Sequence, residues 1–90
     1  MFVLAESCTG GMVSAALTDV AGSSAVLDRG LVTYSNQAKQ DLLGISDKIL
    51  ARYGAVSAET AIAMTTGALL KTPAAQLAAS VTGIAGPGGG

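Results

Sequence analysis

Three short apolar runs alternate with helical segments along the chain, and this alternation limits the folds open to it more than any other feature. The runs are rich in side chains typical of strands and cover Phe2–Ala5, Gly30–Tyr34 and Leu77–Val81. Strands that alternate with helices form a largely parallel sheet with helices on both faces. The sequence therefore predicts an α/β fold, in which a mostly parallel sheet is the middle of three layers (α/β/α).

Capping residues and glycines predict four helices between these strands. Serine or asparagine is favoured at the start of a helix, and glycine just past its end. The expected helices run from about Gly11 to Asp19, from Ser35 or Asn36 to Leu43, from Ser46 to about Tyr53, and from Ser57 to a point before Pro73. Helical periodicity predicts which residues face inward. They are Met12, Ala15 and Ala16 in the first helix, and Ala58, Ala61, Ile62, Thr65 and Leu69 in the last.

Composition excludes several classes of function. The net charge is −1 and only 3% of residues are aromatic, so the chain lacks both the basic patch and the stacking side chains of a nucleic-acid-binding protein. No apolar run reaches the roughly 18 residues that span a membrane. Histidine is absent, and we expect neither a metal nor a cofactor. One cysteine and an N-terminus without a basic segment indicate a cytoplasmic protein.

Polar segments follow all three predicted strands. They are Glu6–Gly11, Tyr34–Lys39 and Thr82–Gly90. Because the carboxyl ends of parallel strands share one edge of a sheet, where ligands bind, we expect these segments to converge on a functional site.

Ser7 and Lys39 are candidates for a nucleophile and its base. Lys39 falls near the start of a helix, where the helix dipole and burial both lower the pKa of an amine, and a neutral amine can accept a proton. Serine with lysine is a known variant of the catalytic triad. The alternative is that Ser7 and Thr9 only cap a helix while Lys39 is solvated at the surface.

Cys8 offers a second nucleophile, in a set with Glu6 and Lys39. This set is less favoured, because neighbouring residues of a strand point to opposite faces and the chain would have to turn to align them. Cys8 is otherwise a small buried apolar residue. Tyr34 either contacts a substrate, by a hydrogen bond or by stacking, or belongs to the core.

Glycines adjoin two of the three segments. Gly10 and Gly11 precede a helix, whose free N–H groups can bind phosphate or a developing oxyanion near Thr9–Gly11. The glycine-rich segment after Thr82 either lets backbone approach a ligand closely or is a flexible tail.

Three segments taken together resemble the CinA C-terminal domain family (competence/damage-inducible protein CinA and its stand-alone relatives). They are Ala5–Gly11 (AESCTGG), Val32–Asn36 with Ala38–Lys39, and Thr82–Gly89 (TGIAGPGG). The resemblance implies a nicotinamide-nucleotide amidohydrolase, which converts nicotinamide mononucleotide (NMN) and water to nicotinic acid mononucleotide and ammonia in pyridine-nucleotide salvage. It also implies serine–lysine chemistry, with the small-molecule nucleotide as substrate.

The resemblance assigns roles to residues of this sequence. Ser7, Lys39 and Tyr34 are expected to be catalytic, and the substrate-binding residues are expected to be Thr9, Gly10, Gly11, Asn36, Thr82, Gly83, Gly86 and Gly88. We also expect a homo-oligomer. The alternative function is a non-catalytic nucleotide-binding or accessory module of the same fold.

Domains of this family are nearly twice as long, and a basic residue of their site lies in the further part. We therefore expect residues 1–90 to be an incomplete portion of a domain, and to be unstable or inactive when made alone.

Overall fold

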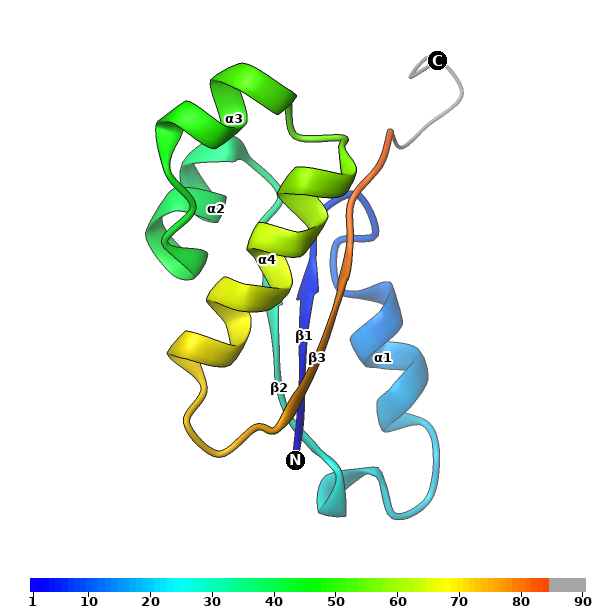
Figure 1. Cartoon of the computed structure of the whole chain (residues 1–90). Coiled ribbons are helices and arrows are strands. Elements are labelled where there is room, and N and C mark those ends of the chain that lie inside the picture. The colour runs from blue at the N-terminus through cyan, green and yellow to red at the C-terminus, as the bar shows by residue number, and fades with distance from the viewer. Residues whose placement is uncertain (85–90) are drawn as a thin grey trace.

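The computed structural model describes residues 1–84 of the 90-residue chain. Three strands alternate with four α-helices and one short 3-10 helix, and all lie in a single α/β unit (Figure 1). In chain order they are β1 (Phe2–Glu6), α1 (Met12–Thr18), η1 (Ser23–Ala25), β2 (Leu27–Val32), α2 (Asn36–Leu43), α3 (Asp47–Tyr53), α4 (Ala58–Lys71) and β3 (Leu77–Val81).

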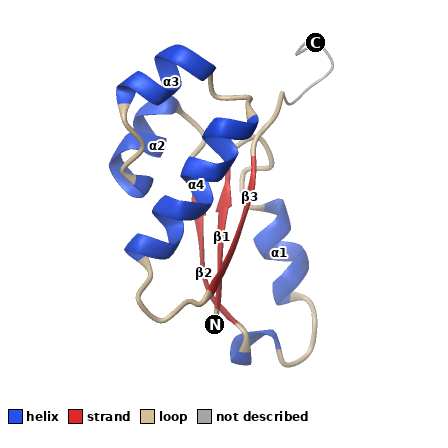
Figure 2. Ribbon diagram, viewed as in Figure 1, coloured by secondary structure: helices blue, strands red, loops and turns tan. Residues whose placement is uncertain are grey.

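The three strands form one parallel sheet in the order β2-β1-β3, so β1 is central. The chain passes from β1 to β2 through α1, and from β2 across to β3 through α2, α3 and α4. Crossovers between parallel strands are right-handed, so crossovers in opposite directions put their helices on opposite faces. Figure 2 shows α2, α3 and α4 together on one side of the strands and α1 on the other. The predicted α/β fold with a parallel sheet is confirmed.

Side chains of the central strand alternate between the two faces. Val3 and Ala5 belong to the main hydrophobic core on the α4 side, whose other buried members are Leu43, Ile45, Leu50, Met64 and Ala68. Glu6 faces α1, where its carboxylate accepts hydrogen bonds from Ser14. A strand that alternates in this way sends the next residue, Ser7, back toward the α4 side.

The predicted caps of three helices are confirmed. The side chains of Ser35, Ser46 and Ser57 each accept a hydrogen bond from the backbone N–H three residues later. Gly44 ends α2 in the left-handed conformation, at φ 68°, which glycine adopts without a steric penalty. The start of α2 is therefore fixed by local sequence, and with it the position of Lys39.

The boundaries predicted for the second strand were wrong. Strand β2 begins at Leu27 and ends at Val32, whereas the sequence indicated Gly30–Tyr34. Asp28 and Arg29 form an ion pair and stay in the strand because β2 is at the edge of the three-stranded sheet, where charged side chains can reach water. Tyr34 lies outside the strand, directly before the cap of α2.

The predicted inner faces of α1 and α4 were also wrong. Met12 is 72% exposed, and Ile62 of α4 is 65% exposed. The buried residues of α4 are instead Thr60, Met64, Gly67 and Ala68. Apolar residues lie on several sides of both helices, so their spacing alone does not select a face. Helix α1 has no fully buried residue, and the buried face of α4 combines Met64 with three small residues.

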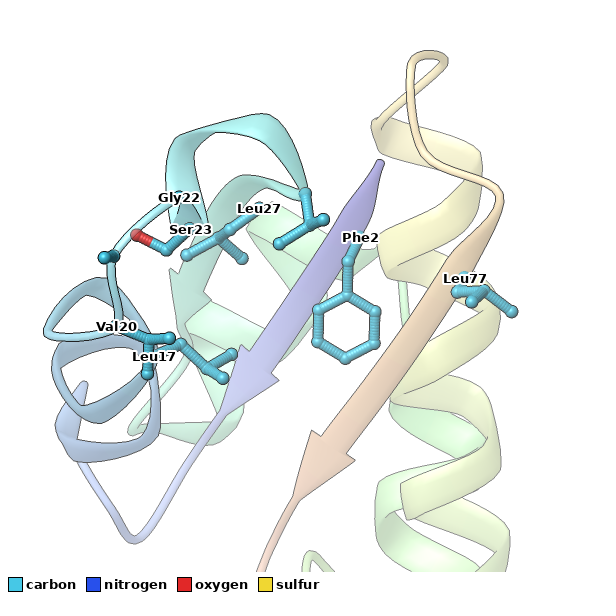
Figure 3. A pocket seen from close by; sticks show the side chains of 9 residues that line it. Phe2, Leu17, Val20, Gly22, Ser23, Leu27 and Leu77 are labelled. Carbon is cyan, nitrogen blue, oxygen red and sulfur yellow. The ribbon is translucent and has the colours of Figure 1, made fainter.

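One hollow of about 490 Å³ lies at the amino ends of the strands. Phe2, Leu27 and Leu77, which begin the three strands, line it together with Leu17 and Val20 (Figure 3). Its walls are almost wholly apolar and include no ionisable side chain. Among the described residues no helix combines the length and apolar character needed to cross a membrane.

Candidate active site

Ser7 and Lys39 meet at the carboxyl end of the sheet. Ser7 directly follows β1, Lys39 is in the first turn of α2, and Lys39 Nζ lies 2.9 Å from Ser7 Oγ. Both side chains are withdrawn from solvent: Ser7 is 5% exposed and Lys39 is 1% exposed. The alternative that Lys39 is a solvated surface lysine is therefore wrong.

The backbone at Ser7 is held from both neighbouring strands. The Ser7 N–H donates to the carbonyl of Val81 at 2.9 Å, and the carbonyl of Glu6 accepts from the Thr33 N–H at 2.7 Å. The Glu6–Ser7 peptide is thus hydrogen-bonded on both sides, to Val81 of β3 and to Thr33 after β2. The backbone that carries the nucleophile candidate Ser7 is therefore held in place.

Two backbone carbonyls share the Lys39 amine with Ser7. Nζ lies 3.1 Å from the carbonyl oxygen of Thr33 and 3.4 Å from that of Tyr34. Burial lowers the pKa of Lys39 below its usual 10.5, although the nearby Cys8 acts in the opposite direction. A neutral amine would donate its two protons to the carbonyls and direct its lone pair at the Ser7 hydroxyl, which is the geometry of a general base.

Glu6 is fully buried on the other side of the strand end. Its carboxylate accepts five hydrogen bonds, from the side chains of Thr9 and Ser14 and from the N–H groups of Gly11, Val13 and Ser14. Burial alone would raise the pKa of Glu6, but these hydrogen bonds outweigh it and lower the pKa to about 2. A carboxylate this acidic stays ionised and does not act as an acid or base toward Cys8.

In the turn that follows β1 (Ser7–Gly11), some backbone N–H groups donate a hydrogen bond and others have no acceptor. Gly10 N–H donates to the carbonyl of Ser7, and Gly11 N–H donates to Glu6. The N–H groups of Cys8 and Thr9 have no acceptor within residues 1–84. Of the N–H groups in this turn, those of Cys8 and Thr9 are therefore the ones available to bind an oxyanion.

Cys8 is beside the third strand-end segment. A β-carbon at Gly83 would lie 3.3 Å from Cys8 Sγ, so the two residues are in contact across the end of the sheet. The hydroxyl of Thr82 donates to the carbonyl of Ala55 at 2.7 Å, which ties the end of β3 to the turn before α4. Among the described residues, Ser7 and not Cys8 is the side-chain partner of the amine.

The remaining predicted residues are less constrained. The side chain of Tyr34 is 66% exposed, so the alternative of a core tyrosine is wrong. Asn36 is exposed at the start of α2. Gly86 and Gly88 lie outside the described residues. Within residues 1–84 there is no group of three acidic, cysteine or histidine side chains placed to hold a metal ion.

Sequence reasoning missed two parts of this site. The carbonyl of Thr33 binds the amine, but backbone atoms leave no signature in a sequence. The sequence suggests Glu6 only as a partner of Cys8 and Lys39, whereas its carboxylate binds the turn after Ser7. An acid at the end of an apolar strand, followed by a glycine-bearing helix start, is the signal that could have revealed it.

Comparison with known proteins gives one consistent result. A family model described as the CinA C-terminal domain matches residues 1–90. The chain is 57% identical over 86 residues to nicotinamide-nucleotide amidohydrolase PncC of Enterobacter agglomerans, and 54% identical over 86 residues to the protein of that name from Escherichia coli K12. Each match covers 96% of this chain and 52% of the relative. The crystal structure of competence/damage inducible protein CihA from Agrobacterium tumefaciens matches with a TM-score of 0.94 at 58% identity, covering 100% of this chain and 54% of that one. The chain thus spans about half the length of these relatives.

Proposed function

The chain belongs to the CinA C-terminal domain family, and from that membership we propose that it supplies the serine–lysine part of a nicotinamide-nucleotide amidohydrolase site. The observation that carries the proposal is the 2.9 Å contact between Lys39 Nζ and Ser7 Oγ in a buried position. Two relatives at 54–57% identity that bear this enzyme name support it.

In the proposed reaction the Ser7 oxygen attacks the carboxamide carbon of NMN while Lys39 takes the hydroxyl proton. The C–N bond of the carboxamide then breaks, and Lys39 returns the proton to the leaving nitrogen. Ammonia departs and leaves an acyl ester on Ser7. Water then attacks the ester, Lys39 passes a proton from water to the serine oxygen, and nicotinic acid mononucleotide is released. The positive pyridinium ring makes the carbonyl carbon electrophilic, so a modestly activated nucleophile suffices.

The tetrahedral intermediate of this reaction carries a negative oxygen that needs donors. The N–H groups of Cys8 and Thr9, which have no acceptor within residues 1–84, are the proposed donors. Removing one such donor typically costs an enzyme about 3 kcal/mol of transition-state stabilisation. A backbone donor directly after the nucleophile also occurs in other strand–nucleophile–helix sites.

The exposed ring of Tyr34 is proposed to stack on the pyridinium, an interaction between an aromatic face and a cation. Asn36, Thr82, Gly83, Gly86 and Gly88 are proposed to contact the rest of the nucleotide, together with a basic residue from outside this chain. Thr9, Gly10 and Gly11 are proposed to bind the substrate through the turn that they form. The Thr9 hydroxyl and the N–H groups of Gly10 and Gly11 already donate to Glu6 and Ser7, so the Thr9 N–H is the group proposed to contact the substrate. The proposed setting is pyridine-nucleotide salvage in the cytoplasm, by a homo-oligomer.

The test is ammonia release from NMN by a protein of the relatives' full length that carries residues 1–90. We expect Ser7→Ala to abolish release and the matched variant Cys8→Ala to retain most of it. The opposite pattern would move the reaction to a cysteine nucleophile. If the wild-type protein binds NMN but releases no ammonia, the domain is a nucleotide-binding module and not an enzyme.

A further inference from the structure

We propose that Glu6 is the positioning residue of the site: its buried carboxylate fixes the turn that carries Ser7 and so sets the geometry of the Ser7–Lys39 pair. This inference rests on the proposed function, because positioning has meaning only if Ser7 reacts. Glu6 itself touches neither the amine nor the serine side chain among its side-chain hydrogen bonds.

The two residues at the end of β1 act on opposite faces of the sheet. Glu6 bonds to the start of α1 on one face, and Ser7 bonds to Lys39 of α2 on the other. One peptide joins them, and it is held by Thr33 and Val81 of the neighbouring segments. Because the neighbouring strands hold that peptide, the Glu6 carboxylate acts on Ser7 from the other side of the residue: Thr9 and Gly11 donate to Glu6, and Gly10 between them donates to the carbonyl of Ser7.

The hydrogen bonds of Glu6 extend from the turn into the start of α1. Oε1 accepts from Thr9 Oγ1 at 2.7 Å, from Gly11 N–H at 3.1 Å and from Val13 N–H at 2.9 Å. Oε2 accepts from the N–H and the hydroxyl of Ser14, at 2.8 and 2.5 Å. Every one of these partners is a donor, so the position requires a group that only accepts.

The backbone is shaped to bring these donors to one carboxylate. Gly10 and Gly11 have φ values of 61° and 108°, which let the chain reverse over the end of β1. Gly30 of β2 makes room on the other side, because a β-carbon there would lie 2.1 Å from Ser14 Oγ. Glycines at three positions thus serve the same carboxylate contact.

Two substitutions test the inference from different directions. Glu6→Gln keeps the size of the side chain but replaces one acceptor oxygen with an NH₂ group, which confronts the turn's N–H groups with a second donor. Gly30→Ala leaves the carboxylate intact and pushes Ser14 away from it. Met64→Ala is the control, since it opens a cavity in the core on the other face of the sheet and destabilises the fold without touching the turn.

The first measurement is steady-state deamidation of NMN by the full-length protein, at a temperature where circular dichroism shows every variant folded. We expect Glu6→Gln to lower kcat about 100-fold with little change in KM, as a displacement near 1 Å of a reacting group does. Gly30→Ala should lower kcat in the same way, Glu6→Asp should recover part of the loss, and Met64→Ala should keep the wild-type kcat. An equal loss of kcat in Met64→Ala, or an unchanged kcat in Glu6→Gln, would overturn the inference.

The second measurement does not depend on the substrate. In wild-type protein the amides of Gly11, Val13 and Ser14 should exchange slowly with deuterium, and in Glu6→Gln they should exchange quickly while the amides of α4 stay protected. A wild-type protein inactive toward NMN would refute the proposed function, and this exchange pattern would then decide alone whether Glu6 fixes the turn. Unchanged protection of the three amides in Glu6→Gln would refute the positioning role whatever the substrate.

Discussion

Replacing Gly67 of α4 with alanine is expected to impair both the fold and the proposed catalysis, although alanine is the better helix former. Gly67 is buried where α4 crosses α2. A β-carbon at this position would lie 2.1 Å from the carbonyl oxygen of Leu43 and 3.0 Å from its carbonyl carbon. The contact is with backbone, which cannot rotate away as a side chain would, so α2 has to move.

The net cost follows from two opposing terms. Alanine in place of glycine inside a helix gains about 1 kcal/mol. Forcing an extra carbon into a packed interior costs about 1–3 kcal/mol, and contact with a backbone carbonyl belongs at the upper end of that range. We therefore expect Gly67→Ala to lower the free energy of unfolding by about 2 kcal/mol.

The displacement should also reach the site. Leu43 and Lys39 are one turn apart on α2 and both are buried, so moving the helix at Leu43 moves the amine away from Ser7 Oγ. A shift of this kind costs about 100-fold in rate. Urea unfolding and NMN deamidation of the full-length protein measure the two effects. Thr66→Ala, at the neighbouring exposed position, is the control that gains helix propensity without a clash. A Gly67→Ala protein at least as stable and active as wild type would show that α2 is not displaced at Leu43.

Three further predictions concern pH and one buried hydroxyl. Glu6 has its pKa lowered from 4.5 to about 2, so it contributes about 3 kcal/mol of stability above pH 4.5 that is lost as the pH falls toward 2. Acid unfolding of wild type against Glu6→Gln measures this, and identical curves would contradict it. Lys39 has a pKa below 10.5 in the folded chain, so the deamidation rate should rise with pH to a plateau as the amine loses its proton. The free energy of unfolding should also rise as the pH increases from the pKa of Lys39 in the folded chain to 10.5, because over this range the unfolded chain binds more protons than the folded one. A deamidation rate that falls over this range would exclude Lys39 as the base. Thr72 Oγ1 is buried without a hydrogen-bond partner within residues 1–84. Replacing this hydroxyl with a methyl group in Thr72→Val should therefore raise the free energy of unfolding by about 1 kcal/mol. A loss of stability in thermal unfolding would show that the hydroxyl has a partner.

The sequence was sufficient to predict features that depend on local chemistry. Serine caps, a glycine at the end of α2 and apolar runs act within a few residues, and they located the helices, the central strand and the strand-end position of Ser7. Because α2 starts where Ser35 caps it, the sequence could bring Lys39 to the same edge of the sheet as Ser7, but it left open whether Lys39 is buried or solvated.

Features that depend on contacts between distant segments could not be predicted in the same way. The buried face of α4 is set by Gly67 meeting Leu43, and β2 starts early because Leu27 and Arg29 pair with β1. The five hydrogen bonds of Glu6 need the path of the whole turn, which no residue spacing specifies.

In the proposed reaction Ser7 forms an acyl ester with the nucleotide, and mass spectrometry of the acid-quenched reaction detects such an ester directly. The full-length protein is mixed with NMN, quenched during turnover and digested, and the peptide that contains Ser7 and Cys8 is fragmented. We expect a nicotinoyl-nucleotide adduct on Ser7 that is absent from the Ser7→Ala protein. An adduct on Cys8, or full turnover with no adduct on either residue, would contradict the role proposed for Ser7.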